Sequence, residues 1–186
     1  LKEAGWTDSN GDGVLDKNGK PFEFSINIAS ASTNGKKIAQ VLREDFKKVG
    51  IKMNILVLDW ALMLERIQNW QFDATAMGWA LGLDSDPYSV WHSSGANKNN
   101  SNNSIGYENK EVDKLLEKAR REMDPEKRHA LYREVHRLIA EDFPVVFLII
   151  EKRLMAVDKR WHNIDFYLPR PCYNTGEWFV PSPLRK

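Results

Sequence analysis

The sequence predicts an α/β fold: a mostly parallel central sheet flanked by helices, with an extended C-terminal tail. Residues 22–28, 51–58 and 72–79 have the patterns of strands, and two helical patterns lie between them with short connections. This alternation favours parallel strands joined by right-handed crossovers. With 186 residues the chain can bury a sizeable core, and we expect one domain over residues 1–186.

Composition excludes several functional classes. The chain has 27 Lys and Arg against 26 Asp and Glu, so its net charge of +1 gives no electrostatic reason to bind nucleic acid or an anionic membrane. The longest apolar run, residues 145–150, has the length of a strand, whereas a membrane helix needs roughly 20 residues. The single cysteine, Cys172, cannot form an internal disulfide. The opening LKEAGW is typical of a helix already under way, so we expect a piece of a longer protein.

Residues 8–19, DSNGDGVLDKNG, form the sharpest local motif. Their spacing matches the start of an EF-hand-type calcium loop, and the candidate calcium ligands are Asp8, Asn10, Asp12, Val14 and Asp16. The twelfth position holds Gly19 where such a loop needs a bidentate Glu, and no helix follows. The sequence therefore favours an Asx-rich turn leading into a strand, with a bound calcium ion as the alternative.

The predicted elements from residue 22 to residue 68 have clear local signals. Residues 22–28 alternate apolar and polar side chains, as a strand does. A helix capped by Thr33 or Asn34 follows and ends at Gly50. After the second strand, residues 51–58, Asp59 can cap a short helix that begins with Trp60.

Residues 72–79, FDATAMGW, are the third predicted strand and lead into the predicted binding site. They are mostly apolar or small, which suits a strand buried on both faces. Gly78 allows close approach to the backbone, and a loop with Asp84 and Asp86 follows Trp79. Ligands of open α/β sheets bind beyond the carboxyl ends of the strands. Either Trp60 or Trp79 alone would indicate core packing, but two tryptophans that follow strands at the same edge shift the interpretation modestly toward a binding wall.

The second half of the chain is predicted to be helical and then extended. Residues 95–104, GANKNNSNNS, read as a flexible surface loop, and residues 109–123 as a helix. A second helix begins at the Asp124–Pro125 pair and reaches residue 142. Residues 144–150 are predicted to form a buried strand. After a turn, residues 153–157 are predicted to continue it. The tail, residues 161–186, holds four prolines and reads as an extended, docked segment.

Several of these stretches together resemble one family. They are LKEAGW with DSNGDGVLDKNGKPFEF, DW with FDATAMGW, DSDPYSVWHSS, IGYENKEVDKLLEKA, DPEKRHALYREVHRLIAEDFPVVFL and a late EWFV. In their order and spacing the chain resembles the C-terminal lobe of family 5 extracellular solute-binding proteins, the dipeptide/oligopeptide-binding class of ABC importers. The resemblance covers essentially all 186 residues.

The resemblance implies a fold, a function and a location. The fold is a type II periplasmic-binding-protein-like lobe, one of two that close on a ligand by hinge motion. The function is to capture a peptide and deliver it to the membrane subunits of an ABC permease, without catalysis or a cofactor. The location is the periplasm or the outer face of the cell membrane. The remaining N-terminal lobe belongs to the same chain, and the complete protein is expected to be a monomer.

The resemblance also carries ligand-binding residues onto this chain. Trp60 and the Gly78–Trp79 pair match cleft positions of the oligopeptide-binding members. Those members place an Asp, which meets the peptide's amino terminus, where this chain has Gly82; Asp84 is the nearest carboxylate able to substitute. We interpret Asp86, before Pro87, mainly as a turn-former.

Basic pocket residues of some members are missing, since Ile67 and Ala76 stand where an Arg would be. Peptide is therefore the predicted ligand class, with an oligosaccharide or another small solute as the alternative.

Two other classes explain less of the sequence. An enzyme would need a nucleophile–base pair or a metal site. Cys172 has no His nearby in sequence, and Asp84 and Asp86 share one loop instead of facing each other across a cleft. A calcium-stabilised structural module would rest on residues 8–19 alone and would leave the two tryptophans unexplained.

Overall fold

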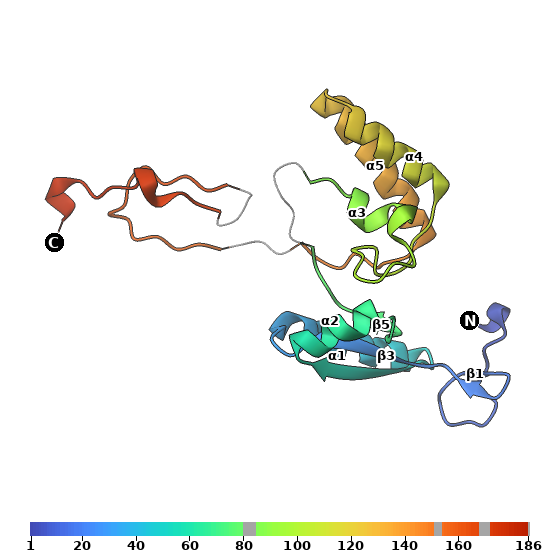
Figure 1. The fold of residues 1–186 in the computed structure, drawn as a ribbon. Helices are drawn as coiled ribbons and strands as arrows, with labels where there is room; N and C mark the ends of the chain where they lie inside the picture. Colours follow the sequence, from blue (N-terminus) through green and yellow to red (C-terminus); the bar gives the residue numbers. More distant parts are fainter. Residues whose placement is uncertain (80–84, 151–153, 168–171, 186) are drawn as a thin grey trace. The chain divides into compact units, whose positions relative to one another are not determined.

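The computed structural model describes residues 1–79, 85–150, 154–167 and 172–185 (Figure 1). It divides into two compact units. Unit 1 contains Leu1–Gly78 and Asn97–Ser104, and unit 2 contains Trp79–Ala96 and Ile105–Lys186. Each unit has its own hydrophobic core, and the expectation of one domain over residues 1–186 stays a prediction. Within the described ranges, no helix has the length and apolar character needed to cross a membrane.

The centre of unit 1 is a parallel sheet of three strands in the order β4-β3-β5. The middle strand, β3 (Glu23–Ala29), pairs along its whole length with β4 (Lys52–Leu58). On its other side β3 pairs with the short β5 (Ala74–Thr75). Because all these pairings are parallel, the structure confirms the predicted sheet.

Two helices flank the sheet, α1 (Thr33–Lys48) and α2 (Trp60–Gln68). Ile26, Ile28 and Met53 pack with Ala39 of α1 in the core of unit 1. Side chains alternate along a strand, so Ser25 and Asn27 point to the other face, where they line a hollow together with Arg66 of α2. The two helices therefore cover opposite faces, as right-handed crossovers require.

The helix caps follow local sequence signals. Asp59 caps α2 as predicted, because its Oδ1 accepts a hydrogen bond from the Leu62 N–H at 3.0 Å. The predicted cap of α1 was wrong by one position. Ser32 Oγ, not Thr33 or Asn34, accepts from the Gly35 N–H at 3.1 Å.

The third predicted strand, residues 72–79, was wrong in both length and burial. Only Ala74 and Thr75 form β5, and one further hydrogen bond joins the Ala76 N–H to the Asn27 carbonyl at 3.1 Å. Met77 and Trp79 are 48% and 51% exposed. In the described part of the chain β5 has a neighbour on one side only. An apolar composition favours burial but does not reveal whether a second neighbouring strand is present.

The N-terminal segment ends in a hairpin that the sequence analysis missed. After η1 (Lys2–Ala4), β1 (Asp16–Lys17) pairs antiparallel with β2 (Lys20–Pro21). The two turn residues, Asn18 and Gly19, both have positive φ, at 54° and 72°. This is the backbone that two-residue hairpin turns favour, and Asn and Gly are the residues that adopt it most readily.

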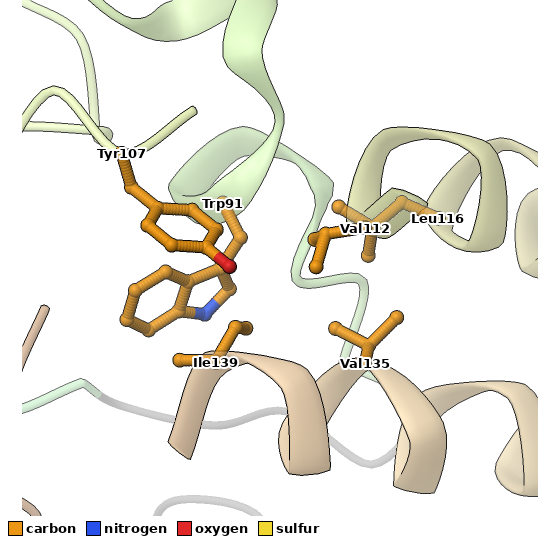
Figure 2. Close-up of a cluster of buried hydrophobic side chains, with 6 residues drawn as sticks. All are labelled: Trp91, Tyr107, Val112, Leu116, Val135 and Ile139. Carbon is orange, nitrogen blue, oxygen red and sulfur yellow. The ribbon is translucent and has the colours of Figure 1, made fainter. Parts of the chain in front are cut away.

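Unit 2 is built on helices. Its elements before the tail are α3 (Tyr88–Trp91), η2 (Ser93–Gly95), α4 (Lys110–Arg121) and α5 (Pro125–Asp142). Asp124 caps α5 and Pro125 is its first residue, as predicted. Asn109, predicted as the first residue of a helix over 109–123, is instead the cap of α4. Figure 2 shows the core between these helices, formed by Trp91, Tyr107, Val112, Leu116, Val135 and Ile139.

The buried strand predicted for residues 144–150 was wrong. These residues form no strand with any described part of the chain, and Val146 and Ile150 are 74% and 96% exposed. Residues 154–157 form no strand either, and residue 153 lies outside the described ranges. A strand needs a hydrogen-bonding neighbour, and an apolar run alone does not supply one.

The remaining tail is largely extended, as predicted. It contains the single-turn helices η3 (Thr175–Glu177) and η4 (Ser182–Leu184), and isolated bridges join His162 to Phe179 and Phe166 to Tyr173.

The loop at residues 95–104 lies only partly on the surface. Asn103 is fully buried and Ala96 is 7% exposed. A polar, aperiodic sequence predicts irregular backbone but not how much of that backbone is covered. Its flexibility stays a prediction.

Candidate functional site

Trp79, a predicted ligand-binding residue, lies against the core of unit 2. Its ring centroid is 5.8 Å from that of Trp91, and the two planes are tilted by 47°. Trp91 is buried and meets the ring of Tyr107 edge-on at 5.6 Å. Figure 2 shows Trp91 and Tyr107 together above Ile139 of α5. Trp79 itself is half-exposed: part of its ring packs against Trp91, and the rest is aromatic surface open to solvent.

A hydrogen-bond network fixes the ring of Tyr107. Its hydroxyl donates to Asp142 Oδ2 at 2.6 Å, and Asn109 Nδ2 donates to the same oxygen at 2.8 Å. These two bonds lower the pKa of Asp142. Burial and the bond to Asp142 raise the pKa of Tyr107. Tyr107 therefore stays protonated and keeps its hydrogen bond to Asp142.

Asp86 is engaged within unit 2. Its Oδ1 accepts a hydrogen bond from the Tyr88 N–H at 3.0 Å, and its Oδ2 pairs with Arg120 Nε at 2.9 Å. These contacts agree with the turn-forming role that the sequence suggested, while a ligand contact of Asp86 stays a prediction. Gly82 and Asp84 lie outside the described residues.

Trp60 and Gly78 belong to unit 1, whereas Trp79 belongs to unit 2. Trp60 is the first residue of α2, follows the end of β4 closely, and is 54% exposed. A Cβ built at Gly78 would meet no described atom within 4 Å, which leaves its backbone open to a neighbouring group. That Trp60, Gly78 and Trp79 contact a ligand stays a prediction.

Ile67 and Ala76, where the resemblance led us to look for an Arg, are buried and partly buried. Ile67 is 6% exposed, and Ala76 packs against the core cluster of unit 1. Apolar side chains at these positions contribute to folding and offer no charge to a ligand.

Unit 1 also contains a hollow of about 370 Å³ that the sequence analysis missed. It is lined by Ser25, Asn27, Leu56, Arg66, Trp70, Gln71, Phe72 and Asp73. Asp73 accepts a hydrogen bond from the Ser25 N–H at 2.8 Å. The only hint in the sequence is Asn27, a polar residue within a strand, which is 1% exposed in the structure. None of the predicted ligand residues lines this hollow.

The side chains of the candidate calcium loop fold back onto their own backbone. Asp8 accepts hydrogen bonds from the N–H groups of Gly11 and Gly13 at 2.8 and 3.0 Å. Asn10 and Asp12 accept from the second N–H after each of them, at 3.0 and 2.8 Å. These are Asx turns, which the sequence favoured over a bound cation.

Asp16 completes the loop by accepting from the backbone and side chain of Ser9, and these two bonds lower its pKa. Across the described ranges, no three His, Cys, Asp or Glu side chains are grouped to hold a metal ion. Calcium binding stays a prediction.

Comparison with known protein families shows which family the chain belongs to. The profile described as bacterial extracellular solute-binding proteins, family 5 Middle, matches residues 1–102, more than half of the chain. The chain belongs to this family. Family 5 is a class of extracellular or periplasmic solute-binding proteins, not of enzymes, and the resemblance stated from the sequence is confirmed.

Among curated family 5 proteins, the oligopeptide-binding protein AppA of Bacillus subtilis is 36% identical over 182 residues. That match covers 97% of this chain and 33% of AppA, so the chain spans about a third of its relative's length.

Solved family 5 structures confirm the predicted fold. The structure of Bacillus subtilis AppA in complex with a nonapeptide matches with a TM-score of 0.81 and 35% identity, over 97% of this chain and 36% of AppA. A periplasmic oligopeptide-binding protein from Thermotoga maritima, solved with bound mannohexaose, matches with a TM-score of 0.68 and 26% identity. That match covers 77% of this chain and 28% of the other.

Proposed function

We propose that this chain is the C-terminal lobe of the substrate-binding component of an ABC importer. In this proposal the complete protein captures a di- or oligopeptide between two lobes and delivers it to the permease in the membrane. The observation that carries the proposal is the match to AppA, whose structure holds a nonapeptide, over 97% of this chain at a TM-score of 0.81. The proposed location is the periplasm or the outer face of the cell membrane.

The two half-exposed tryptophans support a binding role. Trp79 is backed by the buried Trp91, and Trp60 stands at the start of α2 after a strand of the parallel sheet. Aromatic faces give a ligand a large apolar contact, and a few polar groups then orient it. In our proposal the ligand meets Trp60, Gly78, Trp79 and Gly82. Asp84 receives the peptide's amino group.

An oligosaccharide is the second candidate ligand, with the fold and the transport role unchanged. The Thermotoga maritima relative was solved with mannohexaose, and flat indole faces suit sugar rings as well as peptides.

A thermal-shift screen of the full-length gene product that contains this chain separates the candidates. The ligands are peptides of two to nine residues, the same peptides with acetylated amino termini, and mannohexaose. A ligand at a hundredfold excess over its Kd stabilises the folded protein by about 2.7 kcal/mol, so a true ligand stands out. Stabilisation by free peptides but not by acetylated ones supports the proposal and the amine contact. Stabilisation by mannohexaose alone overturns the peptide assignment.

A further inference from the structure

Helix α3 is held at its first residue by Arg120 of α4. Arg120 Nε lies 2.9 Å from Asp86 Oδ2, and its guanidinium carbon lies 4.3 Å from the centroid of the Tyr88 ring. Asp86 in turn accepts the Tyr88 N–H. One planar guanidinium thus pairs by charge with Asp86, two positions before α3, and stacks on Tyr88, the first residue of α3. A lysine ammonium cannot reproduce both contacts.

The other end of α3 is held by α4 as well. The Tyr88 ring stacks on His92 with centroids 4.1 Å apart and planes 19° apart. Asp113 Oδ1 accepts a hydrogen bond from the Ser93 N–H at 2.8 Å, directly after His92. A helix of four residues has almost no stability of its own. Its position is therefore set by its neighbours in unit 2: the packing of Trp91 in the core and these contacts with α4.

Trp79, the proposed ligand contact, packs against the same short helix. Trp91 is three residues after Tyr88 in α3, and Trp91 is the residue against which Trp79 packs. A shift of α3 therefore moves the surface that supports Trp79. From this chain of contacts we propose that Arg120 is a positioning residue for ligand binding. It holds α3 in place, and α3 holds Trp79 through Trp91. The inference rests on the proposed role of Trp79 in the ligand site.

Because Arg120 and Asp86 are solvent-exposed, a positioning role and a purely structural role of Arg120 predict different effects on ligand affinity and on melting temperature. Their side chains are 51% and 40% exposed, and exposed ion pairs contribute little to folding stability. Removal of Arg120 is therefore expected to change ligand affinity more than the melting temperature.

The test compares Arg120→Met with Arg120→Lys in the full-length protein, and Arg121→Met is the matched control. Arg121 is an exposed neighbour in the same last turn of α4. Fluorotryptophan labelling, assigned with Trp79→Phe and Trp91→Phe, reports both rings by fluorine NMR without any ligand. We expect Arg120→Met to shift both resonances, Arg120→Lys to shift them less, and Arg121→Met to leave them unchanged. Unmoved resonances in a folded Arg120→Met protein overturn the inference.

Affinity for a synthetic nonapeptide, measured by calorimetry, is the second readout. Arg120→Met is expected to weaken it about tenfold, and this loss should largely vanish in a Trp79→Ala background, because coupled residues are not additive. An additive loss, or an unchanged affinity despite shifted resonances, contradicts a positioning role. If the wild-type protein binds no peptide, the proposed function fails, and the fluorine spectra still decide whether Arg120 positions Trp79.

Discussion

The indole of Trp79 packs against the indole of Trp91, with ring centroids 5.8 Å apart. Trp91 is 7% exposed and belongs to the core of unit 2, whereas Trp79 is 51% exposed. A binding surface supported by a packed core is already ordered before the ligand arrives. Such a surface loses less conformational freedom on binding, and this favours affinity.

This relationship predicts different roles for the two tryptophans. Trp91→Ala should lower the free energy of unfolding by about 3 kcal/mol or more, because it empties a large site in a packed core. Denaturant unfolding of the full-length protein, followed by circular dichroism, measures the loss. Trp79→Ala is the matched control and should unfold at nearly the wild-type denaturant concentration. Equal destabilisation by both substitutions would place Trp79 in the core.

The network around Asp142 predicts a specific pH dependence of stability. Hydrogen bonds from Tyr107 and Asn109 lower the pKa of Asp142 in the folded protein. Its stabilising contribution is therefore present above the ordinary Asp pKa of about 3.9 and is lost as the pH falls through the lower folded value. We expect the difference in melting temperature between wild type and Asp142→Asn to shrink as the pH falls below about 4. The difference in melting temperature between wild type and Tyr107→Phe should shrink over the same pH range. A difference that stays constant with pH would refute this linkage.

The cap of α2 can be tested by a conservative pair of substitutions. Asp59→Ala removes the acceptor of the Leu62 N–H and should cost about 1 kcal/mol of stability. Asp59→Asn keeps an oxygen in the same place and should cost much less. Thermal melts of both variants make the comparison. If Asn destabilised as much as Ala, the charge of Asp59 would matter and the cap would not.

The loop at residues 8–19 should be stable without a cation. Its Asp and Asn side chains already accept hydrogen bonds from their own backbone. We therefore expect the melting temperature of the full-length protein to be the same in EDTA and in calcium. A rise with calcium that disappears in Asp12→Ala would instead identify this loop as a calcium site.

Local patterns in the sequence were enough to predict β3, β4 and the four longer helices. Alternation, helical spacing and caps such as Asp59 and Asp124 act within a few residues, so a single sequence displays them. The order and spacing of the motifs also identified the family correctly.

Contacts between distant residues could not be predicted in this way. The short β5 and the exposed residues 146–150 depend on which neighbours lie alongside them, and an apolar composition does not reveal those neighbours. The pairing of Arg120 with Asp86 joins a charged helix face to a turn, and in the sequence Arg120 looks like any other solvated charge. The candidate site was therefore predicted as individual residues, without the core that supports them.

Calorimetric titration of the full-length protein with a synthetic nonapeptide, and separately with mannohexaose, tests the central claim most directly. We predict that one molecule of peptide binds per protein and that Trp79→Ala weakens this binding by about 2 kcal/mol, roughly 30-fold, the scale of burying a large apolar side chain. Heat from mannohexaose with none from the peptide, or an unchanged peptide affinity in Trp79→Ala, would contradict a peptide-binding lobe in which Trp79 forms a wall of the site.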